Sequence, residues 1–109
     1  MTLSTHVLDV SRGMPGAGID VALYALDGER RTLVGRAVTN ADGRTDAPLG
    51  TALRAGLYEL VFSVGTYFER QGVDGFYKEI PIRFELDQPG KYHVPLLVSP
   101  WGYSTYRGS

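Results

Sequence analysis

The 109-residue sequence predicts an all-β domain with the architecture of a β-sandwich. About seven or eight short segments alternate between apolar and polar residues, which is the period of half-buried strands. Turn-forming residues separate these segments, and the chain holds 14 glycines and 6 prolines. Short strands at this spacing favour a β-sandwich, and periodicity alone does not give the order of the strands.

Length and composition exclude several classes of function. We expect one domain over residues 1–109. The absence of cysteine excludes disulfide bonds and thiolate metal sites. A formal net charge of −1 gives no broad field for nucleic acid or a membrane surface, and no apolar run approaches the ~20 residues of a membrane span. The N-terminus lacks the pattern of a signal peptide, so we expect a cytoplasmic location.

The first half of the chain is expected to contain three strands and one shorter segment. The strands cover residues 3–10, 19–26 and 31–39, and the short segment covers 44–46. One face of the first strand consists of Leu3, Thr5, Val7 and Asp9, and the other of His6, Leu8 and Val10. Because both faces carry apolar residues, we expect both to be covered.

The second half is expected to add four strands and one short helix. The strands cover residues 57–64, 76–86, 92–98 and 103–106. Residues 48–55 form a connection with room for a helical turn. Residues 66–71 are the only stretch compatible with a helix, and on pattern alone a loop is an equal alternative. Pro81 cannot donate to a ladder, which indicates an edge strand or a bulge.

The last twenty residues, GKYHVPLLVSPWGYSTYRGS, read as a strand, a turn at 99–102 and a second strand. A polar and aromatic hairpin is unusual where chain ends normally fray. This stretch resembles the C-terminal signature of the transthyretin-related 5-hydroxyisourate hydrolases, and residues 106–109, YRGS, match that family's terminal tetrapeptide. Residues 5–23 are similar to its N-terminal motif, and residues 39–44, TNADGR, to its central turn.

The resemblance covers the whole chain and implies more than the pattern does. It implies the transthyretin-like sandwich of two four-stranded sheets with one short helix after residue 64. It also implies a homotetramer, a dimer of dimers, with active sites in the channel between dimers. Exposed β-edges near both chain ends would favour such pairing between subunits.

The chain has only two histidines, His6 and His93. On residues alone each could be an ordinary hydrogen-bonded histidine on a sheet, and two histidines without a third ligand at metal-site spacing are a weak metal signal. The functional alternative is that both point from one sheet face into a cleft, where imidazole serves as base or acid at neutral pH. Both positions match the family's active-site histidines.

Arg44 and the terminal tetrapeptide complete the candidate site. Arg44 could be a solvated arginine after a turn, or a guanidinium that binds a planar anion or imide at two points. The tail could fray, or fold over the cleft. The resemblance implies catalytic roles for His6, Arg44 and His93, and substrate binding by His6, Arg44, Tyr106, Arg107 and Ser109.

The expected activity is hydrolysis of 5-hydroxyisourate to 2-oxo-4-hydroxy-4-carboxy-5-ureidoimidazoline in urate catabolism. Either His6 or His93 would activate water, Arg44 would stabilise the developing charge, and no cofactor or metal is expected. Two other classes are alternatives: a small-ligand carrier that resembles transthyretin, and a β-sandwich adhesion or carbohydrate-binding module. The histidines, the arginine and the YRGS ending argue against the carrier, and aromatics at core positions argue against the adhesion module.

Overall fold

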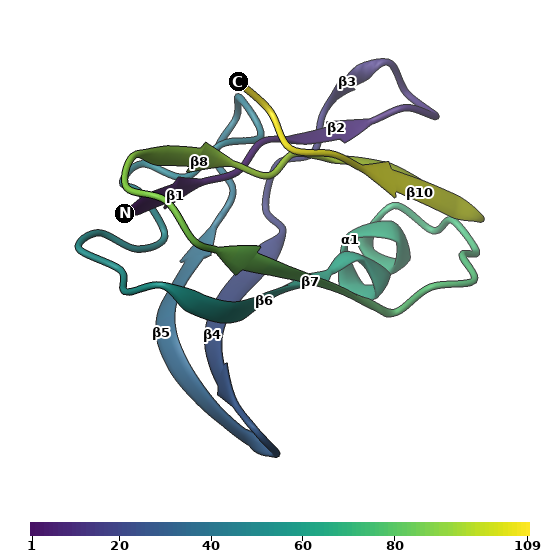
Figure 1. Ribbon diagram of the computed structural model, residues 1–109. Helices are drawn as coiled ribbons and strands as arrows, with labels where there is room; N and C mark the ends of the chain where they lie inside the picture. Colours follow the sequence, from purple (N-terminus) through teal and green to yellow (C-terminus); the bar gives the residue numbers. More distant parts are fainter.

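The computed structural model describes residues 1–109 and consists mostly of strands (Figure 1). The elements in chain order are β1 (Thr2–Ser4), β2 (Val7–Asp9), β3 (Met14–Pro15), β4 (Asp20–Asp27), β5 (Arg30–Val38), β6 (Gly56–Ser63), α1 (Val64–Arg70), β7 (Glu79–Leu86), β8 (Lys91–His93), β9 (Leu96–Ser99) and β10 (Gly102–Thr105). No helix is long and apolar enough to cross a membrane.

Two four-stranded sheets form the sandwich. One has the strand order β10-β9-β2-β3 and the other, called here the long-strand sheet, has the order β5-β4-β6-β7. A third, two-stranded sheet pairs β1 with β8. The predicted all-β sandwich with two four-stranded sheets and one short helix is therefore confirmed, and the parallel β1–β8 pair is an addition to it.

The core lies between the sheets and under the helix. The side chains that are fully enclosed include Leu3, Val7, Ile19, Leu23, Leu60, Phe62, Ile80 and Leu96. They come from both sheets and from the β1–β8 pair, and the alternating pattern of the strands sends them to one side. Burial of this apolar set is the main force that holds the layers together.

The first predicted strand and the strand predicted over residues 92–98 are both wrong as single elements. Each divides into two strands that belong to different sheets: β1 pairs with β8, and β2 pairs in parallel with β9. Residues 5–6 and 94–95, called here the crossover segments, carry the chain from one sheet to the other. At this point the Thr5 hydroxyl donates to the Val94 carbonyl at 2.7 Å, and Pro95 has no N–H for a ladder.

Most of the other predicted elements are confirmed within a few residues, a normal difference between assignments. The helix forms as α1, and β7 is the edge strand that Pro81 indicated. Two expectations are wrong. Residues 44–46 form an isolated bridge at Arg44 and no strand, and the second face of the first strand is open at Val10, which is 53% exposed. Residues 48–55 form the predicted connection, without a helical turn.

The strand predicted from residue 76 begins only at Glu79 because the preceding residues bond elsewhere. The Phe76 N–H donates to the Pro100 carbonyl at 2.7 Å, and the Lys78 carbonyl accepts from the Gly65 N–H at 2.8 Å. These two bonds attach this segment to the β9–β10 turn and to the start of α1, so it cannot join the ladder with β6.

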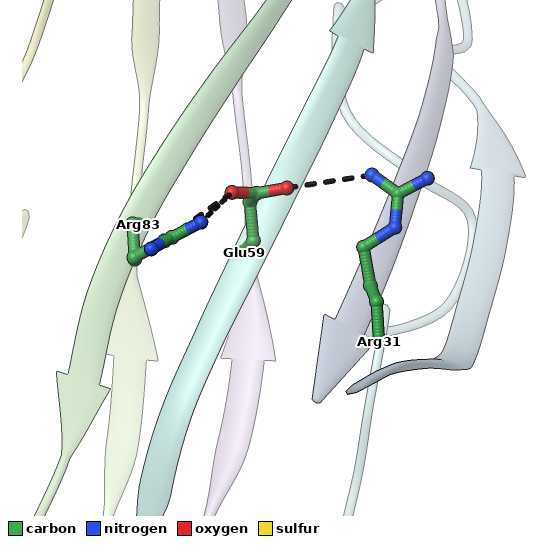
Figure 2. A network of polar contacts seen from close by, with 3 residues as sticks. All are labelled: Arg31, Glu59 and Arg83. Atoms are coloured by element: carbon green, nitrogen blue, oxygen red, sulfur yellow. Dashed lines mark hydrogen bonds and ion pairs between the residues drawn. The ribbon is translucent and has the colours of Figure 1, made fainter. Parts of the chain in front are cut away.

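One buried carboxylate joins three strands of the long-strand sheet (Figure 2). Glu59 on β6 is only 7% exposed and accepts from Arg83 on β7 at 3.1 Å. Its other oxygen lies 3.5 Å from Arg31 on β5. The Arg31 guanidinium also lies over the ring of Tyr24 on β4, 3.9 Å from its centroid. All four strands of this sheet thus contribute to one polar cluster.

Candidate active site

The β1–β8 pairing brings Ser4 and His93 together from opposite ends of the sequence. The two residues are register partners in the parallel pair, so their side chains leave the sheet on the same side. The Ser4 Oγ lies 2.9 Å from Nδ1 of His93. The imidazole is half-buried, which fixes its position while leaving part of the ring accessible.

A tight turn places Arg44 next to the first crossover segment. The Asn40 side-chain oxygen accepts from the N–H groups of Asp42 and Arg44, at 2.9 and 3.2 Å. Gly43 has a φ of +74°, and a Cβ there would lie 2.3 Å from the Val7 carbonyl oxygen. Only glycine fits this position. The turn therefore holds Arg44 in an antiparallel bridge with His6.

The C-terminal tail, which is the yellow end of the chain in Figure 1, runs back from β10 and packs against His93. The Gly108 N–H donates to the His93 carbonyl at 2.7 Å. A Cβ on Gly108 would lie 2.6 Å from Cδ2 of the imidazole, so the main chain rests directly against the ring. The Arg107 guanidinium instead lies over the Tyr92 ring, 4.6 Å from its centroid.

These pieces surround an open cleft of about 570 Å³. Its lining residues are Ser4, Arg44, Lys91, Tyr92, His93, Tyr106, Gly108 and Ser109. Four of the predicted site residues are in this lining: Arg44, His93, Tyr106 and Ser109. His6 lies beside it, bridged to Arg44, and Arg107 packs on Tyr92 instead. An opening of about 540 Å³ beside α1 contains no histidine.

The electrostatics of the cleft favour a neutral imidazole. Burial lowers the pKa of His93, and the charges of Arg44 and His6 lower it further. A histidine that stays neutral near pH 7 can accept a proton from water. No three His, Asp or Glu side chains gather as a metal site would require.

Sequence reasoning missed Ser4, Lys91 and Tyr92 as cleft residues. A weak signal existed, because Ser4 precedes His6 by two positions and Lys91 precedes His93 by two, so each shares a strand face with a candidate histidine. The contact between Ser4 and His93 depends on a pairing between the two ends of the chain, and periodicity does not reveal which strands pair.

The comparisons with known proteins agree with this geometry. A family model described as the HIUase/Transthyretin family matches residues 3–108. The 5-hydroxyisourate hydrolase of Mesorhizobium japonicum is 54% identical, over 98% of this chain and 91% of that protein.

Two solved structures extend the comparison. The Klebsiella pneumoniae 5-hydroxyisourate hydrolase is 38% identical over the full length of both chains, with a TM-score of 0.88. Sea bream transthyretin, solved in complex with thyroxine, is 26% identical with a TM-score of 0.92, over 99% of this chain and 95% of that one.

Proposed function

This chain belongs to the HIUase/Transthyretin family, and from that premise we propose that the cleft at His93 is where it hydrolyses 5-hydroxyisourate. The reaction belongs to urate catabolism and yields 2-oxo-4-hydroxy-4-carboxy-5-ureidoimidazoline. One observation carries the assignment of the site: a histidine with a lowered pKa and an arginine line the same cleft. A base and a cation side by side are what amide hydrolysis by water requires.

The chemical step begins with water at the lactam carbonyl. Neutral His93 takes a proton from the water while the water oxygen forms a bond to the carbonyl carbon. The π electrons of the carbonyl group move onto the carbonyl oxygen. Arg44 lies in the same cleft and stabilises that oxyanion. The C–N bond then breaks, the proton passes from the imidazolium to the leaving nitrogen, and a carboxylic acid remains that ionises in water.

The other site residues bind and orient the flat ring. Tyr106 and Ser109 line the cleft and offer hydroxyl groups to ring carbonyls or N–H groups. His6 forms an antiparallel β-bridge with Arg44, so it is suited to position Arg44 and to bind the substrate. Arg107 is 4.6 Å from the Tyr92 ring centroid and keeps the tail packed over the cleft.

The proposal includes a homotetramer, formed as a dimer of dimers, from a single domain that works in the cytoplasm. Two features support assembly. The edge strands β7 and β10 leave one side of each sheet without a partner strand. Trp101 and Tyr103, at and after the β9–β10 turn, are 69% and 40% exposed. Sedimentation velocity tests this directly, and a monomer at micromolar concentration would contradict it.

The activity is tested by an ultraviolet time course. Urate oxidase generates 5-hydroxyisourate from urate, and its decay is followed with and without this protein. We expect strong acceleration over the spontaneous rate, and its loss in the Arg44→Ala variant, whose exposed side chain can be removed without disturbing the core. The absence of acceleration by folded protein would contradict the hydrolase, and ligand binding without turnover would indicate a carrier.

A further inference from the structure

Ser4 has no part in the reaction described above, yet it makes the only side-chain hydrogen bond to His93 in the structure. Its Oγ lies 2.9 Å from Nδ1 of the imidazole. The same oxygen lies 3.5 Å from the carbonyl oxygen of Tyr92, at the long limit of a hydrogen bond. Ser4 also lines the cleft, so the contact belongs to the site and not to the core.

The proton inventory of these three groups decides the direction of the bonds. A serine hydroxyl has one proton to donate, and a carbonyl oxygen has none. If Ser4 donated to His93, the Tyr92 carbonyl would have no donor in this pair of contacts. Both contacts are hydrogen bonds only when Nδ1–H donates to the Ser4 Oγ and the Ser4 hydroxyl donates to the Tyr92 carbonyl.

We infer that Ser4 is a positioning residue, which holds His93 in the tautomer with its proton on Nδ1 and leaves Nε2 free to accept a proton from water. The inference rests on the proposed function, because it names the atom through which His93 acts. It also selects His93 over His6 as the general base. The orientation of a histidine is commonly set by the hydrogen bond that its other nitrogen makes.

The surroundings of the ring make this choice consequential. The cationic or titratable groups around it are contributed by His6, Arg44, Lys91, Tyr92 and Tyr106. Burial, and then the charges of Arg44 and His6, lower the pKa of His93. Above pH 7 a neutral imidazole must adopt one tautomer or the other. The main chain at Gly108 lies close to the Cδ2 edge of the ring. A half-turn of the imidazole about its Cβ–Cγ bond would bring Nδ1 to this edge and take it away from the Ser4 hydroxyl.

The proton balance of the reaction is unchanged by this role. Nε2 takes a proton from water, and the imidazolium keeps its Nδ1–H bonded to Ser4 while the intermediate forms. Nε2–H then gives the same proton to the leaving nitrogen. Ser4 neither gains nor loses a proton, and it forms no covalent bond.

Two variants at one position isolate the hydroxyl. Ser4→Thr keeps it, whereas Ser4→Val has nearly the same shape as threonine but lacks it. The chain has only two histidines, so ¹⁵N-histidine labelling gives few signals, and a His6→Ala sample assigns them. Above pH 7.5 we expect the native protein and Ser4→Thr to show a protonated Nδ1 and a free Nε2. A protonated Nε2 in the native protein would overturn the inference.

Kinetics add a second, independent readout. We expect Ser4→Val to lower kcat about 10-fold with little change in KM, because a general base supplies about 10²–10⁴ of the rate and only its orientation is impaired. Ser4→Thr should recover most of the rate. The control Ser63→Ala removes a hydroxyl at the end of β6 in the long-strand sheet and should leave kcat unchanged.

The two readouts separate this inference from the proposed function. If Ser4→Val keeps both the native tautomer and the native kcat, the positioning role is wrong although hydrolysis at the cleft stands. If the native protein does not hydrolyse 5-hydroxyisourate at all, the proposed function is wrong, and the tautomer measured by NMR still decides whether Ser4 orients His93. Circular dichroism and sedimentation confirm that each variant is folded and assembled.

Discussion

The crossover segments and the long-strand sheet use the same secondary structure in opposite ways. In the long-strand sheet, β4, β5, β6 and β7 run for eight or nine residues and pair with one another along their length. At the crossover segments, strands of three or four residues end, and the chain changes sheets. His6 lies in one crossover segment and is bridged to Arg44, and His93 directly precedes the other segment. The polar cluster at Glu59 lies instead within the regular sheet (Figure 2).

The difference shows what each kind of geometry can do. A regular ladder occupies the main chain with its own hydrogen bonds and sends side chains straight up or down. Where the ladder is interrupted, the main chain of one segment can bond a distant one, as Gly108 bonds His93 and Gly43 bonds Val7. These bonds bring residues 4, 44, 93 and 108 to one place. The crossovers should therefore affect turnover, and the long-strand sheet should affect stability.

The largest effect is expected at His93. Replacing it with alanine removes the proposed general base, and kcat/KM should fall about 10³-fold. The free energy of unfolding should change little because the side chain is only half-buried. Stopped-flow decay of 5-hydroxyisourate and urea unfolding measure the two quantities. A large loss of stability with unchanged turnover would contradict the assignment of turnover to the crossover segments.

Gly108 offers a smaller and more specific test. In Gly108→Ala the new methyl would lie 2.6 Å from the His93 ring, so the ring or the tail must move. A shift of about 1 Å in a catalytic group can cost about 10²-fold in rate, which is the expected loss in kcat/KM. The matched control is Gly102→Ala, where the methyl meets only the Ser99 hydroxyl at 3.9 Å. Equal effects of the two substitutions would contradict the proposed contact.

Glu59 tests the other side of the comparison. Glu59→Gln keeps the volume and removes the charge that two arginines share, and we expect a loss of about 1 kcal/mol in the free energy of unfolding. The value is small because Arg31 and Arg83 are 50% and 67% exposed and regain water. Turnover should not change. The control Glu69→Gln loses only an exposed pair with Lys78 at 3.8 Å and should have no measurable effect.

The smallest effect is the pH dependence caused by His93. Its pKa is lowered in the folded protein, so below the ordinary value of 6.5 the unfolded chain binds a proton that the folded chain resists. The contribution of His93 to the free energy of unfolding is therefore fully present above pH 6.5. It is lost as the pH falls through the pKa of the folded state. The acid limb of kcat/KM should also lie below pH 6.5. In His93→Gln the free energy of unfolding should depend less on pH over this range. An acid limb of kcat/KM above pH 7 in the native protein would contradict a lowered pKa.

Sequence patterns predicted most strands but not where they change sheets. Leu3, Thr5, Val7 and Asp9 are all buried, so the alternation continues without a break through the crossover. Tyr92, Val94, Leu96 and Val98 behave in the same way. Alternation reports which side chains point inward and gives no sign of a new partner strand. Only Pro95 marked the second break, and a proline is equally compatible with an edge strand.

The candidate site was predictable only in part. Motif resemblance indicated His6, Arg44, His93 and the tail, and the structure places four of these residues in one cleft lining and two beside it. Their catalytic and binding roles remain predictions for the variants above. The contact of Ser4 with His93 could not have been identified from the sequence, because it joins two residues 89 positions apart.

That long separation has a consequence for how the protein is made. The β4–β5 hairpin closes across two residues and can form early, whereas the β1–β8 pair must wait for nearly the whole chain, because distant pairings cost more loop-closure entropy. A nascent chain would therefore bury much of the long-strand sheet while its cleft is still absent. In refolding, the return of tyrosine fluorescence should precede the return of turnover. The cleft would thus be completed only in a late step of folding.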